Sequence, residues 1–165
     1  MQVQRITPCL WFASQAEEAA EFYCAIFSNS RILRISRYGD AGHEIHGRPS
    51  GSVMTVMFEL DGQTFTALNG GPVFRFNEAI SLQVNCDTQQ ELDHYWGWLS
   101  AGGDESAQQC GWLKDKYGVS WQIIPAVLAD MTADPDPRKT ERVMAALLKM
   151  KRLDIPSLQR AFEET

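Results

Sequence analysis

The chain has 165 residues, of which 44% are hydrophobic and 22% charged, a composition typical of a globular domain and not of a disordered segment. Its formal net charge of −6 and its scattered basic residues argue against a nucleic-acid-binding surface. No apolar run is long enough to span a bilayer, and no basic-then-apolar leader follows Met1, so we expect a cytoplasmic protein without a membrane partner.

The first part of the chain predicts one β-α-β-β-β module. Its four strands are expected at residues 3–12, 31–38, 52–60 and 63–69. Ser14 to Glu17 have the form of a capping box, which predicts a helix running to Phe27. Residues 39–51 form a glycine-rich loop. Regular secondary structure is expected to end at Asn69-Gly70-Gly71-Pro72.

The same order of elements then repeats. Strands are expected at 79–86, near 105–109, and on both sides of a hairpin turn within 110–125. Thr88 to Glu91 form a second capping box, and the helix that follows runs to Gly102. After Pro125 the pattern becomes helical, with Asp136 as a cap and Pro137 at the first helical position.

The hairpin from Cys110 to Pro125 has the clearest alternation in the chain. Because side chains alternate between the two faces of a strand, Val119, Trp121 and Ile123 share one face, and we expect it to be buried against helices. Ser120 and Gln122 then point to the opposite face. A neutral amide there suits a hydrogen-bonding floor for a small organic ligand, or else satisfies buried backbone groups.

The cysteines offer no paired chemistry. Cys9, Cys24, Cys86 and Cys110 are too far apart for a CxxC redox or zinc motif, so free thiols in a reducing compartment are expected. Cys110 lies beside the hairpin and stays a candidate for the site. It has no evident His or Lys activator, which favours a structural role over a nucleophilic one.

Several segments together carry a family resemblance. They are Leu68 to Pro72, Phe74, Phe76-Asn77, Ile80 to Leu82, Gln109 to Gln122, and Lys151 to Ile155. With the duplicated module, they make the chain similar to the PhnB-like branch of the vicinal-oxygen-chelate superfamily, which contains glyoxalase I, extradiol dioxygenases and bleomycin-resistance proteins. The PhnB-like branch is often labelled 3-demethylubiquinone-9 3-methyltransferase.

The resemblance implies an α+β fold in which two βαβββ modules form a curved mixed sheet around a cleft, commonly completed in a homodimer. We expect the modules at residues 1–72 and 73–127, with a C-terminal helical extension at 128–165, in one compact glyoxalase-like domain.

Enzymes of the superfamily bind a divalent metal through His and Glu side chains on the first and last strands of each module. The corresponding segments here offer only neutral side chains, namely Thr7, Pro8, Cys9, Thr66, Leu68, Asn69, Ala79, Ser81 and Gln122. Neutral oxygens alone bind such a cation weakly, so we predict no metal there and no cofactor. The methyltransferase label also lacks support, because neither predicted helix start carries the glycine-rich turn that nucleotide-type cofactors use.

The leading hypothesis is therefore a metal-independent small-molecule-binding homodimer. Its candidate ligand-binding residues are Thr66, Cys110, Trp112, Ser120 and Gln122. The alternative is an enzyme, either a lyase or isomerase or a dioxygenase-like protein, using a metal held by His43 and His46 in the glycine-rich loop. A solvated polar loop is the favoured interpretation of these two histidines, and the sequence identifies no catalytic residue.

Overall fold

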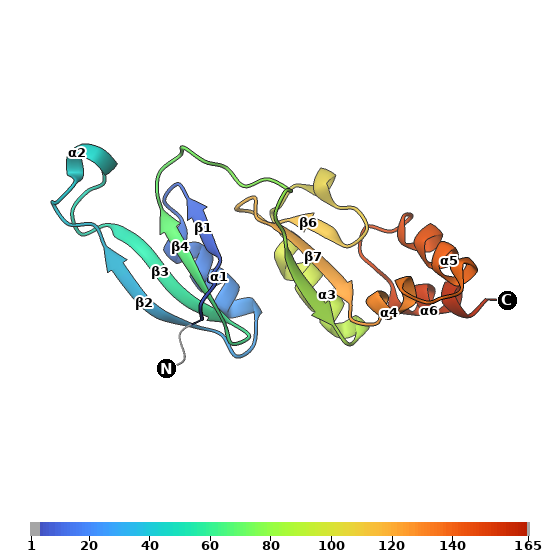
Figure 1. The fold of residues 1–165 in the computed structure, drawn as a ribbon. Helices are drawn as coiled ribbons and strands as arrows, with labels where there is room; N and C mark the ends of the chain where they lie inside the picture. Colours follow the sequence, from blue (N-terminus) through green and yellow to red (C-terminus); the bar gives the residue numbers. More distant parts are fainter. Residues whose placement is uncertain (1–3, 165) are drawn as a thin grey trace. The chain divides into compact units, whose positions relative to one another are not determined.

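The computed structural model describes residues 4–164 and divides into two compact units, one ending at Arg75 and the other beginning at Phe76 (Figure 1). Each unit is a mixed β-sheet with helices packed on it, which confirms the predicted α+β class. Within residues 4–164, no helix is long and apolar enough to cross a membrane.

The first unit has the predicted β-α-β-β-β order. Its elements are β1 (Cys9–Phe12), α1 (Ala16–Ile26), β2 (Arg31–Arg37), a short helix α2 (His43–His46), β3 (Val53–Leu60) and β4 (Gln63–Asn69). The strands lie in the order β1-β4-β3-β2, with β1 parallel to β4 and the other pairs antiparallel. The first strand is shorter than expected, since it starts at Cys9, and the loop expected at 39–51 contains the turn of helix α2.

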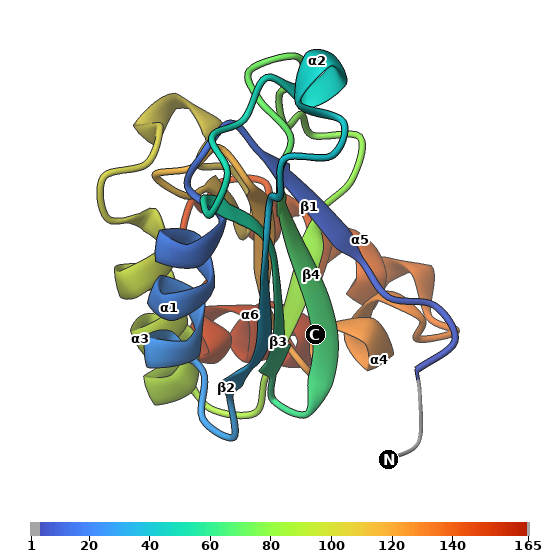
Figure 2. The ribbon, with the colours of Figure 1, turned by 90° about the vertical axis from the view of Figure 1, so that its left-hand side faces the viewer.

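Small side chains bring α1 close to the sheet of the first unit. Ala16, Ala19 and Ala20 are fully buried on one face of the helix, and the larger Tyr23 stacks on Phe58 of β3 with ring centroids 6.4 Å apart. Figure 2 shows α1 lying along one face of this sheet. Burying this apolar face is the main stabilising contribution to the unit.

The capping box predicted at Ser14 is wrong. Helix α1 begins at Ala16, its N-cap is Gln15, and no side chain of the cap accepts a helix N–H. Instead the buried Asn69 at the end of β4 accepts the N–H of Ala16 through Oδ1 at 2.8 Å and donates from Nδ2 to the Val53 carbonyl at 3.1 Å. The helix start is therefore satisfied by the sheet.

The second unit carries a three-stranded sheet and most of the helices. Its elements are β5 (Leu82–Cys86), α3 (Gln89–Ser100), the 3₁₀ turn η1 (Glu105–Ala107), β6 (Trp112–Lys114), β7 (Ser120–Pro125), α4 (Leu128–Thr132), α5 (Pro137–Leu147) and α6 (Ile155–Glu163). The strands lie in the order β5-β7-β6, with β5 parallel and β6 antiparallel to β7.

The strand expected near 105–109 does not form. The Asp104 carboxylate accepts hydrogen bonds from both the backbone N–H and the hydroxyl of Ser106, which turns the chain into η1. An isolated bridge from Gln109 to Trp112 is what remains of the pairing. The local side-chain turn of Asp104 therefore competes successfully with the extended conformation.

The capping box at Thr88 is confirmed. Thr88 Oγ1 accepts the N–H of Glu91, and the Glu91 carboxylate accepts the N–H of Thr88 in return. Buried side chains of the helix, Leu92, Trp96 and Leu99, then form the core of the unit with Trp121 and Ile123 of β7.

The turn between β6 and β7 is built around a buried carboxylate. Asp115 Oδ1 accepts the N–H groups of Tyr117 and Val119 at 2.9 and 3.0 Å, and Oδ2 accepts the indole N–H of Trp121 at 2.8 Å. The side chain is 2% exposed. Asp115 therefore fixes the hairpin turn and the Trp121 ring at the same time.

The segment that follows α5 is fastened to the second unit by backbone and amide contacts. Cys110 and Gly111 donate their N–H groups to the carbonyls of Met150 and Lys151, at 2.9 and 2.8 Å. Gln89 donates to the Leu153 carbonyl and accepts the N–H of Ile155, at 3.1 and 2.8 Å. The Gln89 amide thus satisfies one backbone carbonyl and one backbone N–H of the segment between α5 and α6, as an adjacent β-strand does.

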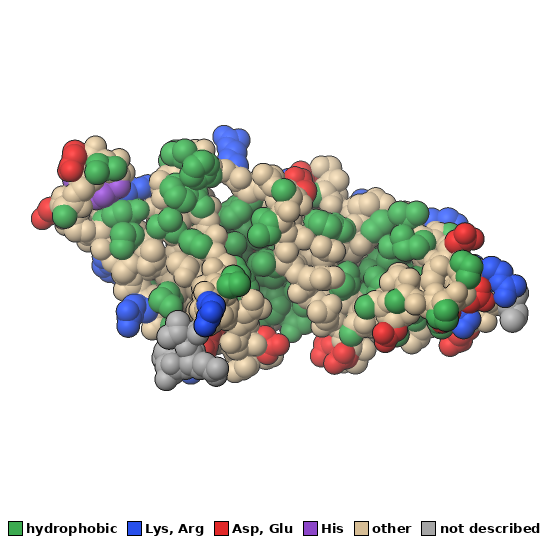
Figure 3. Space-filling view, viewed as in Figure 1, with side chains coloured by type: hydrophobic (Ala, Val, Ile, Leu, Met, Phe, Trp, Pro, Cys, Tyr) green, Lys and Arg blue, Asp and Glu red, His purple; other side chains and the backbone are tan. Residues whose placement is uncertain are grey.

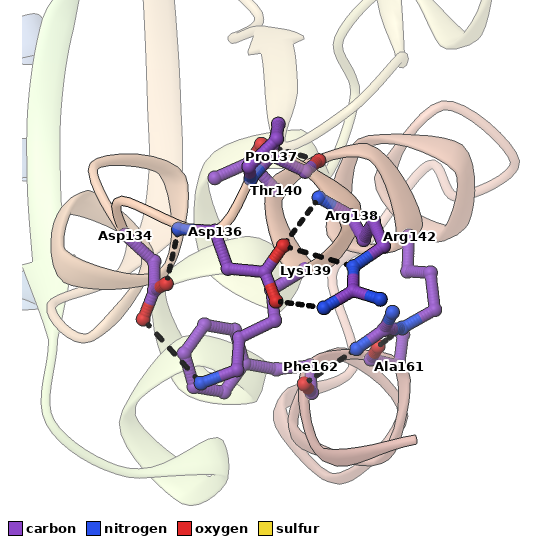
Figure 4. A network of polar contacts seen from close by, with 9 residues as sticks. All are labelled: Asp134, Asp136, Pro137, Arg138, Lys139, Thr140, Arg142, Ala161 and Phe162. Carbon is purple, nitrogen blue, oxygen red and sulfur yellow. Dashed lines mark hydrogen bonds and ion pairs between the residues drawn. The ribbon is translucent and has the colours of Figure 1, made fainter. Parts of the chain in front are cut away.

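Helices α5 and α6 are joined at their ends by the network in Figure 4. The Arg142 guanidinium donates to the carbonyls of Ala161 and Phe162 in the last turn of α6. Lys139 lies 4.7 Å from the centre of the Phe162 ring and pairs with Asp134 at 3.6 Å. Asp136 caps α5 through the N–H of Arg138, as the sequence predicted.

We predict that Asp115→Ala lowers the free energy of unfolding by about 3 kcal/mol, because it leaves three N–H donors around a buried site without their acceptor. The matched control is Asp104→Ala, which removes an exposed carboxylate that caps a turn and should therefore cost clearly less than Asp115→Ala. Urea denaturation of both variants measures the difference. Equal losses would show that Asp115 has no special role in the hairpin.

Candidate functional site

The second sheet has a polar face on the side away from α3. In the β6–β7 ladder Lys114 lies opposite Ser120 and Trp112 opposite Gln122, and in the parallel ladder Gln83 lies level with Gln122. Because Trp121 and Ile123 are buried on the helix side, these five residues share the other side, which we call the polar face. In Figure 1 α3 lies behind this sheet, and in Figure 3 the side chains in front of it are mostly hydrophobic or uncharged.

Gln122 is held on the polar face by one hydrogen bond. Its Nε2 donates to Ser81 Oγ at 2.8 Å, across from β7 to the residue before β5. This bond fixes the amide plane, while the half-buried side chain keeps its carbonyl oxygen as an acceptor. From the sequence, Gln122 could either bind a ligand or form hydrogen bonds to buried backbone groups. In the structure its hydrogen-bond partner is a side chain, that of Ser81.

Ser120 presents a buried hydroxyl without a partner. The residue is 2% exposed. Among the buried side-chain oxygen and nitrogen atoms of residues 4–164, its Oγ is the one without a hydrogen-bond partner. An unmet buried hydroxyl costs free energy, and such groups call for a functional or structural explanation.

The chain before β5 crosses the polar face next to Ser120. Continuing the register of Leu82 with Trp121 by one residue sets Ser81 level with Ser120. Glu78 forms an ion pair with Lys114 of β6, and Ser81 bonds Gln122 of β7. Residues 77–81, which we call the strap, are thus held on the polar face by these two contacts.

The ion pair of the strap has an exposed and a covered partner. The Glu78 side chain is 60% exposed and the Lys114 side chain 23%. The hydrogen bond from Lys114 is the main cause that lowers the pKa of the Glu78 carboxyl below its ordinary value. An exposed pair of this kind adds little stability, so Glu78 can leave Lys114 at small cost.

Two of the predicted site residues are not part of the β5-β7-β6 sheet. Thr66 belongs to β4 of the first unit, where it pairs with Cys9 and Met57. Cys110 precedes β6 and has a φ of 52°, and its backbone N–H donates to the Met150 carbonyl in the segment after α5. The structure therefore gathers Trp112, Ser120 and Gln122 on one face, and gives Cys110 a fastening role.

The cysteines of the described chain are free, and three of them have raised pKa values. Burial raises the pKa of the Cys9 and Cys24 thiols above the ordinary value. Burial, assisted by the negative charges of Glu91 and Asp87, raises the pKa of Cys86 to about 12. Because the thiolate is the nucleophile, these three thiols are poorly suited to covalent catalysis.

His46 is engaged within its own loop. Its Nδ1 accepts the N–H of Arg48 at 2.9 Å, its Nε2 lies 3.3 Å from the Ala41 carbonyl, and its ring packs on Tyr38 with centroids 4.5 Å apart. Both ring nitrogens thus have partners within the loop. Across residues 4–164, no three His, Cys, Asp or Glu side chains gather closely enough to hold a metal ion.

A cavity of about 220 Å³ in the first unit was not predicted. It lies at the start of α1 and is lined by Ser14, Glu17, Arg48, Pro49, Ser52, Val53 and Asn69. Arg48 donates to the Ala13 carbonyl at its edge, and Asn69 is occupied in capping α1. None of the site residues proposed from the sequence lines it.

The fold of the first unit, with its first strand parallel to its last, and the order of elements define a protein with the glyoxalase/bleomycin-resistance-like fold. The model of the 3-demethylubiquinone-9 3-methyltransferase family matches residues 4–124. The chain belongs to this family. A comparison with curated proteins gives no match.

Solved structures agree with this assignment. A putative 3-demethylubiquinone-9 3-methyltransferase, PhnB protein, from Bacillus cereus is 38% identical, covers 74% of this chain and 100% of its own, and has a TM-score of 0.63. Protein PA1353 from Pseudomonas aeruginosa is 19% identical over 72% of this chain and 95% of its own, with a TM-score of 0.54, which supports the fold alone.

The family match ends before α4. Residues 125–165, with α4, α5 and α6, therefore lie outside the matched range. The tail segment Lys151 to Ile155, which contributed to the resemblance in the sequence, belongs to this part. Its contacts with Gln89, Cys110 and Gly111 show how the extension is attached to the matched part of the second unit.

We predict that the Glu78 carboxyl titrates below the ordinary pKa of a glutamate, and that Lys114→Met raises its midpoint. Because the folded-state pKa is lowered, the contribution of the pair is present above the ordinary carboxyl pKa and is lost as the pH falls through the folded value. The chemical shift of the Glu78 side-chain carboxyl against pH measures both midpoints. An unchanged midpoint in Lys114→Met would show that the pair does not form in solution.

Proposed function

We propose that the chain is a metal-independent binding protein for a small organic molecule, which docks on the polar face of the second unit. The observation that carries the proposal is the unpartnered buried hydroxyl of Ser120 beside the oriented amide of Gln122. Ligand sites combine a few such polar anchors with apolar or aromatic surface, and Trp112 supplies an indole opposite Gln122.

Metal independence is supported by the chemistry of the donors. The polar face offers a hydroxyl, two amides, an indole and an ammonium group, from Ser120, Gln83 and Gln122, Trp112 and Lys114. A divalent cation requires anionic oxygen or imidazole ligands for tight binding, and an ammonium group next to it would repel it.

The activity in the family's name is not part of the proposal. Nucleotide-type cofactors bind glycine-rich turns that lead from a strand into a helix. Here α1 starts after Gln15 and α3 after Thr88, whose side chain is used in its capping box. Neither helix start is preceded by a glycine-rich turn of this kind.

Assembly as a homodimer is a further part of the proposal, and it rests on the resemblance to the vicinal-oxygen-chelate superfamily. Analytical ultracentrifugation of the full chain tests it. A single dimeric species is expected at micromolar concentration, and a monomer would contradict this part without affecting the ligand site.

The proposal predicts that a library of small organic compounds contains ligands which raise the melting temperature of the chain, and that EDTA leaves their effect unchanged. Gln122→Ala should weaken the binding of such a compound about tenfold, because it removes an oriented polar anchor. Gln159→Ala, at an exposed position of α6, is the matched control and should leave binding unchanged. Calorimetry of wild type and both variants measures the affinities.

Two results would overturn the proposal. One is binding that Gln122→Ala and Gln159→Ala affect equally, which would place the ligand elsewhere. The other is ligand binding that EDTA abolishes and a divalent metal restores, which would make the site a metal site.

A further inference from the structure

We infer that the ligand of the polar face carries an anionic group such as a carboxylate, and that Glu78 of the strap occupies the place of this group until the ligand displaces it. The inference rests on the proposed function and adds the ligand's chemical class and a residue that competes with it.

Lys114 provides the positive charge. It lies directly opposite Ser120 in the β6–β7 ladder, so both side chains project from the same face of the sheet. The Lys114 side chain is largely covered, at 23% exposed, and its recorded ion-pair partner is Glu78. A partly covered ammonium group favours an anionic partner, because the local dielectric is lower than in water.

Ser120 provides a second donor at the same place. Its hydroxyl is buried and lacks any hydrogen bond within the described chain, although a serine hydroxyl donates one bond and accepts others. The Glu78 carboxylate reaches Lys114 but has no recorded bond to Ser120. The carboxylate of a ligand is not attached to the strap, so it can take a position that Glu78 does not reach. There it can accept hydrogen bonds from Lys114 and Ser120 together.

The strap explains how the place stays covered. Its exposed residues Glu78, Ala79 and Ile80 lie between the two pins, the Glu78–Lys114 ion pair and the Ser81–Gln122 hydrogen bond. Within the strap, Asn77 Oδ1 accepts the N–H of Ala79 at 2.9 Å, which makes a local turn. Releasing Glu78 breaks one exposed ion pair and leaves the turn intact, so a competing anion meets a small barrier.

Trp112 and Gln122 extend the site beyond the charge. They lie two residues along the ladder from Lys114 and Ser120, and therefore on the same face. A planar organic anion placed with its carboxylate at Lys114 would therefore have its ring beside an indole. This combination favours an aromatic or unsaturated carboxylate over an inorganic anion.

The test uses benzoate as the probe and its neutral isostere benzamide as the comparison, by calorimetry on the full chain. Glu78→Gln removes the weak competing charge and should tighten benzoate binding about threefold, while benzamide binding stays unchanged. Glu141→Gln, an exposed glutamate of α5, makes the same charge change and should leave both affinities unchanged. Lys114→Met should weaken benzoate about tenfold and leave benzamide unaffected.

Ser120→Ala tests the second donor without altering charge. It should weaken benzoate binding about threefold, and it should not unfold the chain because it removes an unsatisfied buried hydroxyl. Circular dichroism of every variant confirms that it is folded. If Lys114→Met fails this check, Lys114→Gln replaces it, and Glu78→Gln against Glu141→Gln still decides the question.

The inference is overturned if benzoate binds no better to Glu78→Gln than to Glu141→Gln, if benzamide follows benzoate in all variants, or if benzoate binds none of the proteins. When neutral compounds still bind in a Gln122-dependent manner, the proposed function stands and the anionic class is wrong. When no compound depends on Gln122, both are wrong.

Discussion

The hairpin that carries the polar face depends on the buried carboxylate of Asp115. Two of its acceptor bonds close the turn through the backbone of Tyr117 and Val119, and the third fixes the Trp121 ring in the core. Because side chains alternate along β7, an anchored Trp121 fixes Gln122 on the opposite face. A shift of one residue would exchange the two faces, so the site exists only in the register that Asp115 holds.

The sequence predicted features that depend on local patterns. The alternation of Trp121 and Gln122 and the capping box of Thr88 with Glu91 are correct because their partners lie within a few residues. The cap of α1 was missed because its acceptor, Asn69, is 53 residues away from Ala16. The strand near 105–109 failed for the opposite reason, since the turn made by Asp104 is more local than the ladder it replaced.

The candidate site was predictable in part for the same reason. Strand alternation alone places Ser120, Gln122 and Trp112 on this face. The position of Lys114 depends on the register of the β6–β7 ladder, and that of Glu78 on a loop whose path no sequence pattern indicates. Cys110 was a candidate because it adjoins the hairpin. The structure adds that its backbone N–H donates to the Met150 carbonyl, a contact with the segment beyond the family match that no sequence pattern indicates.

The central claim is that the polar face of the second unit is the place where a small organic molecule binds. The most direct measurement is the map of backbone amide shifts in a nuclear magnetic resonance titration of the full chain with benzoate, without added metal. The account predicts that the largest changes fall on Ser81, Lys114, Ser120 and Gln122. Changes concentrated instead around Ser14, Arg48 and Val53 would place the ligand in the cavity of the first unit and contradict the account.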